Sequence, residues 1–344
     1  MGDRIASAAD PSLLAAVESD QPYFDRSYGH TWSFTPKPGA AVYGRTEAFA
    51  PAPLDHLAGG RFLRVPFRRI PVIDVGSTAD LAALAARIVS GDASIHLMWR
   101  GQTRGYYLDR PEEDQLRLFG STAVREPSLV PSAARSKMEF SQVFPPWAAI
   151  LDAYLSGRAH SLPRSDSRRA ELAGFHSSYR YRLWAFATAQ HYGLPSVGLD
   201  VTTDLWTAVL FALHEFRFDE ATGVTSFSRV GPDAEPVLYA MGGFQNDLFD
   251  DEKLAPGWMQ CERPKAQTAH FFGTGWGAAA NKAAERIFMV LRLVNHATWA
   301  LPKTVKQLFP APEEDPLLDF LLRARERFPE VAREARLHRV YHVP

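Results

Sequence analysis

Several polar residues of this sequence are of the types that bind phosphate groups, transfer protons or hold sugar hydroxyls. Arg100 follows a short apolar run and is followed by Gly101 and Gln102. Its planar guanidinium can bind a phosphate or a carboxylate through two hydrogen bonds. Gly101 would let a ligand approach the backbone closely. Taken alone, a surface arginine paired with an acidic neighbour is the commoner situation.

A second group of candidates lies where an expected helix ends and an expected strand and helix follow. Its members are His191, Tyr192, Asp200, Thr202 and Thr203. An imidazole can act as a general acid or base, and hydroxyl and carboxylate groups can hold a ribose. The structural alternatives are that His191 caps its helix and that Thr203 or Asp204 caps the next one. A helix N-terminus also binds anions, so the two roles are compatible.

A third group follows later in the chain. Glu262 could transfer a proton or orient a sugar hydroxyl, and Gln267 could hydrogen-bond the same hydroxyl but cannot take a proton. The glycine-rich run 273–277 is similar to a phosphate-binding loop, but a plain turn is the preferred interpretation, because the Walker lysine and the dinucleotide spacing are absent. The chain shows no paired zinc-ligand spacing, so we expect no metal site.

Short strands and helices must position these groups. The apolar run 94–99 predicts a strand that ends in Arg100. Helical spacing predicts one long helix from Glu171 to His191, which Gly193 and Pro195 end. A short strand would then deliver Asp200 and Thr202 to a sheet edge, before a helix over 204–216. Segment 223–236 is expected to be loop, and 315–333 one amphipathic helix.

Composition limits the classes of function. The chain has 344 residues with a net charge of −1, so we expect no strong global nucleic-acid binding. Its single cysteine excludes an internal disulfide and a cysteine-based zinc site. No apolar run approaches a membrane span, and the first twenty residues have no signal-peptide pattern. These features lead us to expect a cytoplasmic protein without a membrane partner.

The order of the expected elements indicates a fold class. Helices and strands alternate without regular βαβ spacing, which favours an α+β fold with a mixed central sheet of short strands and flanking helices. We expect an N-terminal arm and accessory region over 1–90 that packs on the main body. The main α+β domain would span 91–325, and a C-terminal extension would span 326–344.

The motifs together resemble the FRG domain, a family named for an aromatic-Arg-Gly motif. The matching segments are Trp99-Arg100-Gly101-Gln102, residues 126–132, AQHYGLP at 189–195, Ala208, Phe211 and Ala212, then Arg263, Gln267 and Phe271, and finally residues 308–310. The resemblance covers about residues 94–322. Ser196-Val197-Gly198 stands where the family has Thr-Arg-Leu, so the anion contact of that arginine is absent.

A second resemblance is to the arginine-type ADP-ribosyltransferases. It implies an ADP-ribosyltransferase-like fold that takes NAD as a substrate. Arg100 would hold the NAD pyrophosphate or ribose, and the Thr202 and Thr203 hydroxyls would support the nicotinamide ribose. Glu262 or Gln267 would fill the position of the acid that fixes the ribose 2′-hydroxyl as nicotinamide leaves. Gly101, Gln102, Tyr192 and Asp200 would complete the cofactor site.

Three functions follow as hypotheses. The first is an NAD-binding ADP-ribosyltransferase-like enzyme that transfers or hydrolyses ADP-ribose, with the acceptor open. The second is a non-catalytic module that senses a nucleotide or nucleic acid in bacterial defence or toxin systems, since Gln267 replaces a clear catalytic acid. The third is another group-transfer or lyase enzyme in which His191 is the base.

Overall fold

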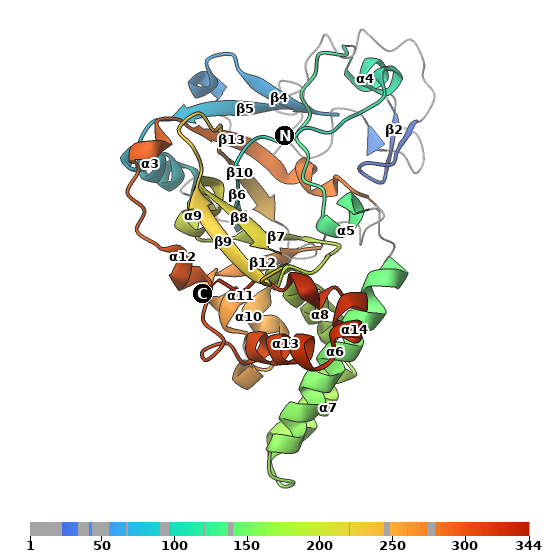
Figure 1. Ribbon diagram of the computed structural model, residues 1–344. Helices are drawn as coiled ribbons and strands as arrows, with labels where there is room; N and C mark the ends of the chain where they lie inside the picture. Colours follow the sequence, from blue (N-terminus) through green and yellow to red (C-terminus); the bar gives the residue numbers. More distant parts are fainter. Residues whose placement is uncertain are drawn as a thin grey trace. The chain divides into compact units, whose positions relative to one another are not determined.

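The structure is a computed structural model with side chains. It describes residues 23–33, 41–42, 55–66, 68–89, 96–119, 121–136, 140–219, 221–243, 248–259, 261–273 and 279–343. The elements are named as in Figure 1.

The protein is mixed α+β, as expected, with an eight-stranded mixed sheet and flanking helices. It divides into two compact units, each assembled from three separate segments of the chain. Unit 1 consists of residues 1–130, 231–243 and 278–300, and unit 2 of residues 131–230, 244–277 and 301–344.

Unit 1 is mainly β-structure. Its strands are β1 (Tyr23–Asp25), β2 (His30–Ser33), β3 (Ala41–Val42), β4 (Phe62–Val65), β5 (Arg68–Val75), β6 (His96–Gln102), β10 (Val237–Gly243) and β13 (Ile287–Leu293). Its helices are η1 (Asp55–Ala58), α3 (Thr78–Val89), α4 (Glu112–Phe119), η4 (Lys282–Arg286) and η5 (His296–Thr298).

Five strands of unit 1 lie in the order β6-β10-β13-β5-β4. Only the pair β13–β5 is parallel, and the other three neighbours are antiparallel. The register places Arg100 of β6 opposite Tyr239 of β10. Helix α3 buries Leu81, Leu84 and Ile88, which recur at helical spacing and form one apolar stripe.

Unit 2 contains most of the helices. They are α5 (Ser132–Arg135), α6 (Phe140–Ser161), α7 (Ser167–His176), α8 (Tyr179–His191), α9 (Leu205–Leu213), α10 (Asp251–Leu254), η2 (Gly257–Met259), α11 (Glu262–Ala266), α12 (Val305–Leu308), α13 (Pro316–Arg327), α14 (Pro329–Glu334) and η6 (Leu337–Arg339). Its strands are β7 (Leu199–Thr202), β8 (His214–Asp219), β9 (Val224–Arg229), β11 (Leu248–Asp250) and β12 (Ala269–Phe272).

The strands of unit 2 form two groups. Strands β11, β12 and β7 lie side by side and are antiparallel, and β8 and β9 form a separate hairpin. One large apolar core joins α6, α7, α8 and α13, with fully buried residues such as Leu151, Ala185 and Leu321. Figure 1 shows α6 and α7 packed along each other within this unit. This core holds α8, and therefore His191 at its end, in a fixed position.

Two expected helices are each broken into two. The predicted helix from Glu171 to His191 is wrong at Ser177–Ser178, where α7 ends and the Ser178 side chain accepts a hydrogen bond from the Tyr181 N–H to cap α8. The predicted helix over 315–333 stops at Phe328, because Pro329 restricts the preceding residue to extended backbone.

Two other predictions are wrong where the structure has the hairpin β8–β9. The helix expected over 204–216 ends at Leu213, and the expected loop 223–236 contains β9. Segment 214–219 alternates polar and apolar residues with a period of two, and its exposure alternates in the same way. This period is a strand signal, and the helical interpretation missed it.

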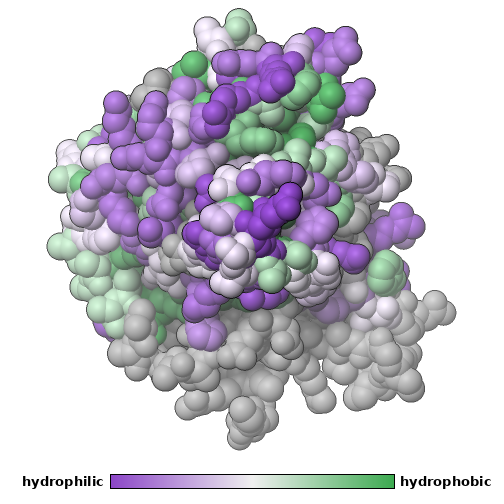
Figure 2. Space-filling view, turned by 90° about the horizontal axis from the view of Figure 1, so that it is seen from below, coloured by the Kyte–Doolittle hydropathy of each residue, from purple (hydrophilic) through white to green (hydrophobic). Residues whose placement is uncertain are grey.

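The helices of the described segments include none that is long and apolar enough to cross a membrane. On the face shown in Figure 2, hydrophilic residues predominate over the described area, and hydrophobic residues form smaller groups between them.

Candidate functional site

The turn that ends α8 explains why glycine follows the Gln-His-Tyr sequence. The helix stops in a turn in which the Gly193 N–H bonds the Gln190 carbonyl and the Leu194 N–H bonds the Ala189 carbonyl. Gly193 has φ +85°, which favours glycine. A Cβ there would lie 2.5 Å from the Arg339 carbonyl oxygen. Glycine is therefore required both by the turn and by the C-terminal segment that crosses it.

His191 is fully buried at this helix end and has polar partners on both ring nitrogens. Its Nε2 lies 2.7 Å from Asp251 Oδ2, and its Nδ1 lies 3.2 Å from Gln267 Oε1. The Gln267 amide nitrogen donates to the Leu308 carbonyl at 3.0 Å, which fixes the amide oxygen toward the imidazole. Both ring nitrogens thus face acceptors, and the arrangement suits an imidazolium.

The electrostatics agree with that protonation state. Burial by itself would lower the pKa of His191, because it disfavours the charged ring. The nearby charge of Asp200 and the hydrogen bonds to Asp251 and Gln267 outweigh burial, so the pKa of His191 is raised above its ordinary value. The shift in pKa therefore favours the protonated imidazole between these carboxylates.

Asp200 is the member of this group that reaches solvent. It lies on β7 with Oδ1 3.6 Å from His191 Nε2, and its side chain is 29% exposed, against 2% for Asp251. A buried cation behind a partly exposed carboxylate favours its ionised form. Asp200 can thus present a negative charge to a bound molecule.

The Thr202 hydroxyl forms two hydrogen bonds within unit 2. It donates to the Gln267 carbonyl at 2.9 Å and accepts from the Asp204 N–H at 2.9 Å. Thr202 is buried, whereas its neighbour Thr203 is exposed. Asp204 caps α9, as one of the two residues expected to do so, by accepting the Trp206 N–H at 2.8 Å.

Tyr192 and Arg263 form a buried pair next to His191. The Tyr192 hydroxyl donates to Asp315 at 2.7 Å. The Arg263 guanidinium lies over the Tyr192 ring at 4.6 Å and donates to the carbonyls of His191 and Tyr341, at 2.9 and 2.8 Å. Burial lowers the pKa of Arg263. This pair fixes the C-terminal segment against the end of α8.

Glu262 and Gln267, the two candidates for the acid position, have different surroundings. Glu262 begins α11, its side chain is 36% exposed, and it lies 3.4 Å from the Lys265 ammonium. Gln267 is buried, and both ends of its amide are used by His191 and Leu308. Gln267 carries no carboxylate, and the Glu262 carboxylate pairs with a half-exposed lysine, whereas the Asp200 carboxylate lies beside a fully buried imidazole.

Arg100, Gly101 and Gln102 belong to unit 1. They form the last three residues of β6, opposite Tyr239, Leu238 and Val237 of β10. All three are partly exposed. The expected strand is present, but it continues through Gln102, so Arg100 lies within the strand rather than at its end.

Two further predictions concern ligand sites. Most of the glycine-rich run 273–277 lies outside the described residues. Among the residues that are described, no group of three or more His, Cys, Asp or Glu side chains is arranged to hold a metal ion.

Sequence reasoning missed two carboxylates that complete the unit 2 cluster. Asp251 lies 60 positions after His191, and Asp315 lies 123 positions after Tyr192. No spacing rule connects residues so distant. Asp315 carried a local signal, because it is followed by Pro316 at the start of a helix and its side chain caps that helix.

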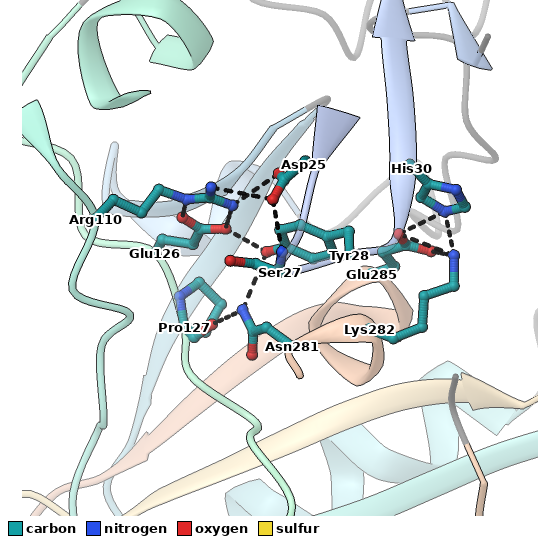
Figure 3. Close-up of polar contacts among 10 residues, drawn as sticks. All are labelled: Asp25, Ser27, Tyr28, His30, Arg110, Glu126, Pro127, Asn281, Lys282 and Glu285. Atoms are coloured by element: carbon teal, nitrogen blue, oxygen red, sulfur yellow. Dashed lines mark hydrogen bonds and ion pairs between the residues drawn. The ribbon is translucent and has the colours of Figure 1, made fainter. Parts of the chain in front are cut away.

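Unit 1 contains a second polar cluster that the sequence did not indicate. The Arg110 guanidinium pairs with Asp25 at 2.9 Å and with Glu126, and all three side chains are at most 4% exposed. The Tyr28 hydroxyl also donates to Glu126, and the Asn281 amide donates to the Tyr28 hydroxyl at 3.2 Å. Figure 3 shows these groups facing one another, with Lys282 and Glu285 beside them near His30.

Comparison of the chain with protein-family models, with curated proteins and with solved structures finds no match.

Proposed function

We propose that this protein is an ADP-ribosyltransferase-like enzyme that binds NAD and transfers its ADP-ribose to an acceptor or to water. The observation that supports this most is the partly exposed Asp200 carboxylate, 3.6 Å from the buried His191 ring. When nicotinamide leaves NAD, positive charge develops at the ribose carbon. A fixed carboxylate stabilises that charge or orients the ribose 2′-hydroxyl.

The proposal moves the acid role from Glu262 or Gln267 to Asp200. The Gln267 side chain cannot transfer a proton. Its amide groups already form hydrogen bonds with His191 and Leu308 inside unit 2. Glu262 remains a solvent-facing carboxylate paired with Lys265. Asp200 differs from both, because it lies beside the buried His191 ring, which Asp251 keeps in place.

The sequence also predicts contacts of NAD with an arginine and with a threonine hydroxyl. Arg100, Gly101 and Gln102 belong to unit 1, and their contact with the NAD pyrophosphate or ribose stays a prediction from the resemblance, because a guanidinium can bind two phosphate oxygens at once. The exposed Thr203 hydroxyl is the better candidate for the nicotinamide ribose, since the Thr202 hydroxyl is used internally.

A titration calorimetry experiment with NAD tests the binding part of the proposal. We expect saturable binding to the wild-type chain and a loss of about tenfold or more in affinity for Arg100→Ala, because one charge-assisted pair is removed. Arg182→Ala, an exposed arginine on α8, serves as the matched control and should bind as the wild type does. Unchanged affinity of Arg100→Ala would show that Arg100 does not contact NAD, and absence of binding would show that the chain does not take NAD as a ligand.

A non-catalytic nucleotide sensor is the second candidate, and one observation favours it. The Thr202 hydroxyl, the Gln267 amide and the Tyr192 hydroxyl are all satisfied within unit 2, so they act on structure rather than on a substrate. NAD binding that protects the protein against heat without release of nicotinamide would favour the sensor.

The geometry argues against His191 as a general base. A base needs a ring nitrogen with a free lone pair within reach of the substrate. His191 has no exposed side-chain surface, and both of its nitrogens face oxygen acceptors. In the proposal, His191 is a positioning residue for Asp200.

A further inference from the structure

One face of the unit 1 sheet carries a row of polar side chains. Gln102 of β6 lies opposite Val237 of β10, and Val237 lies opposite Arg292 of β13. Both pairs are antiparallel, so the opposite side chains lie on the same face of the sheet. Arg292 in turn bonds Asp74 of the next strand, β5, with which it is in register. The row therefore crosses four neighbouring strands on one face.

Asp74 holds two arginines at the end of this row. The Arg292 guanidinium donates to both oxygens of Asp74, at 2.8 and 3.1 Å, and Arg61 donates to Oδ2 at 2.6 Å. The two guanidiniums therefore meet at one carboxylate oxygen. Burial opposes ionisation of Asp74, but the hydrogen bonds from Arg292 and Arg61 outweigh it and lower the pKa of Asp74. The carboxylate thus stays charged and fixes both arginines.

The three charged groups leave positive charge and hydrogen-bond donors for another molecule. Two guanidiniums share one carboxylate, and each guanidinium has five N–H donors, of which Asp74 takes only one or two. The side chains of Arg61, Arg292 and Asp74 are 44%, 36% and 32% exposed, so solvent reaches them. The Glu235 carboxylate also acts on Arg292, but through its charge at longer range.

An ordinary surface ion pair is the simplest alternative, and such pairs contribute little to stability, about 0–1 kcal/mol. Two features of the row go beyond an ion pair. Val237 is buried between Gln102 and Arg292, so the polar groups stand on either side of an apolar residue. Gln102 Oε1 is shielded from solvent and has no hydrogen-bond partner among the described residues, which is a costly state for an amide oxygen.

We propose that Arg61, Arg292 and Gln102 form a binding site for a sugar phosphate, in which the two arginines hold the phosphate and Gln102 accepts a hydrogen bond from a sugar hydroxyl. A phosphate monoester has three oxygens that can bind two guanidiniums at once. The strands of Gln102 and Arg292 are roughly 10 Å apart, and both side chains are long enough to reach one ligand between them. The sugar would lie over Val237.

This site is independent of the proposed reaction at Asp200. Its residues belong to unit 1, whereas Asp200 belongs to unit 2. Arg61 and Arg292 are also not among the residues that the sequence assigned to NAD. The proposal therefore holds whether or not the protein cleaves NAD, and a failure of either leaves the other standing.

Titration calorimetry of the full chain with ribose 5-phosphate, at constant ionic strength, tests the proposal. We expect saturable binding to the wild type, weaker binding of inorganic phosphate and no binding of ribose. Arg61→Gln with Arg292→Gln should lower the affinity for ribose 5-phosphate at least about tenfold, because both charge-assisted contacts are lost. Gln102→Leu should weaken ribose 5-phosphate severalfold and leave the affinity for inorganic phosphate unchanged, since only the hydroxyl contact is removed.

The matched control is Arg168→Gln, which removes an arginine that is 46% exposed and paired with Asp166 in unit 2. It should bind ribose 5-phosphate as the wild type does. Arg61→Lys with Arg292→Lys keeps the charges but not the planar fork, should also bind more weakly, and decides the matter if the glutamine variant fails to fold. No binding of ribose 5-phosphate by the wild type, equal affinity of the arginine variants, or equal binding of ribose would overturn the proposal. Equal affinities for ribose 5-phosphate and inorganic phosphate would overturn the role of Gln102.

Discussion

The side chains around His191 satisfy most of one another's hydrogen-bonding groups. Asp251 and Gln267 hold the ring, Leu308 holds Gln267, and the Arg263 guanidinium holds the carbonyl of His191 itself. The group therefore acts as a rigid support whose accessible part is Asp200. In the proposed function, a small number of buried residues positions the Asp200 carboxylate, which would stabilise the charge on the ribose.

The raised pKa of His191 predicts how stability depends on pH. A group whose pKa is higher in the folded chain contributes fully below its unfolded pKa of about 6.5 and loses that contribution as pH rises through the folded value. The free energy of unfolding should therefore fall as pH rises above about 6.5. His191→Gln should cost roughly 3–5 kcal/mol, because Asp251 loses its buried partner, and it should flatten this part of the curve.

Urea unfolding of both proteins between pH 6 and 9 measures this effect. The slopes of the two proteins should differ most between about pH 6.5 and the raised pKa of folded His191, where only the folded state carries the proton. Parallel curves for the two proteins would show that His191 is neutral when folded.

Gly193 gives a prediction that depends on backbone conformation. Gly193→Ala places a Cβ 2.5 Å from the Arg339 carbonyl oxygen at φ +85°, so it should cost more than the roughly 1–2 kcal/mol of a left-handed residue alone. Gly157→Ala is the matched control, because Gly157 lies inside α6 with open space around it. It should be neutral or stabilise by up to about 1 kcal/mol. Equal effects of both substitutions on the melting temperature would contradict this explanation of the Gly193 turn.

At the scale of elements, β7 and α9 place Asp200 and fix the backbone after it. Strand β7 pairs with β12 so that Asp200 lies opposite Phe271. A Cβ on Gly198 would lie 2.3 Å from the Phe271 ring, so this position is occupied by glycine for packing. The packing of Phe271 thus gives a physical reason for glycine at position 198.

The N-terminal cap of α9, formed by Asp204, leads to a prediction for the free energy of unfolding. Burial opposes ionisation of Asp204, but the Lys303 ammonium and the Trp206 N–H outweigh it and lower the pKa of Asp204. Asp204→Ala should cost roughly 1–2 kcal/mol, and Asp204→Ser should cost less because serine also caps helices. The stabilisation that the Asp204 carboxylate provides is present above about pH 3.9. It is lost as the pH falls through the lower pKa of Asp204 in the folded chain. Denaturant unfolding checks both substitutions, and equal losses for alanine and serine would show that the cap contributes little.

Local patterns predicted the elements that follow from local rules. A strand leading to Arg100, a strand carrying Asp200 and Thr202 and a helix ending at His191 were predicted, because periodicity, Gly193 and Pro195 act over a few residues. The break at Ser178 was missed because apolar residues at helical spacing continue across it, from Leu172 and Phe175 to Leu183. The partners Asp251 and Asp315 were missed because tertiary packing alone brings them to His191 and Tyr192.

At the scale of the molecule, the chain forms two units whose segments alternate along the sequence. The predicted division at residues 90 and 325 uses consecutive segments, whereas each unit has three separate ones. Composition changes little along this chain, so the sequence offers no marker for such an arrangement. The pairing of β10 and β13 with β5 and β6 is a long-range property of unit 1.

The buried cluster of unit 1 predicts a unit-specific loss of stability. Arg110→Ala leaves Asp25 and Glu126 buried without their cation and should cost roughly 3–5 kcal/mol. Hydrogen exchange should then increase most in residues 23–33, 105–130 and 279–286, with smaller changes at α6 and α8. Arg217→Ala, a surface arginine that is 72% exposed, is the control. Uniform acceleration across both units would contradict an anchoring role confined to unit 1.

Release of nicotinamide from NAD by the purified chain tests the central claim most directly. We predict that the wild type releases nicotinamide and that Asp200→Asn releases it roughly 100-fold more slowly, because the fixed charge beside the ribose is lost. Asp319→Asn, which changes an exposed carboxylate of α13, should react as the wild type does. Asp200→Asn should also keep its NAD affinity within a few-fold and its melting temperature. Equal rates for Asp200→Asn and the wild type, or no release above the rate in buffer, would contradict the account.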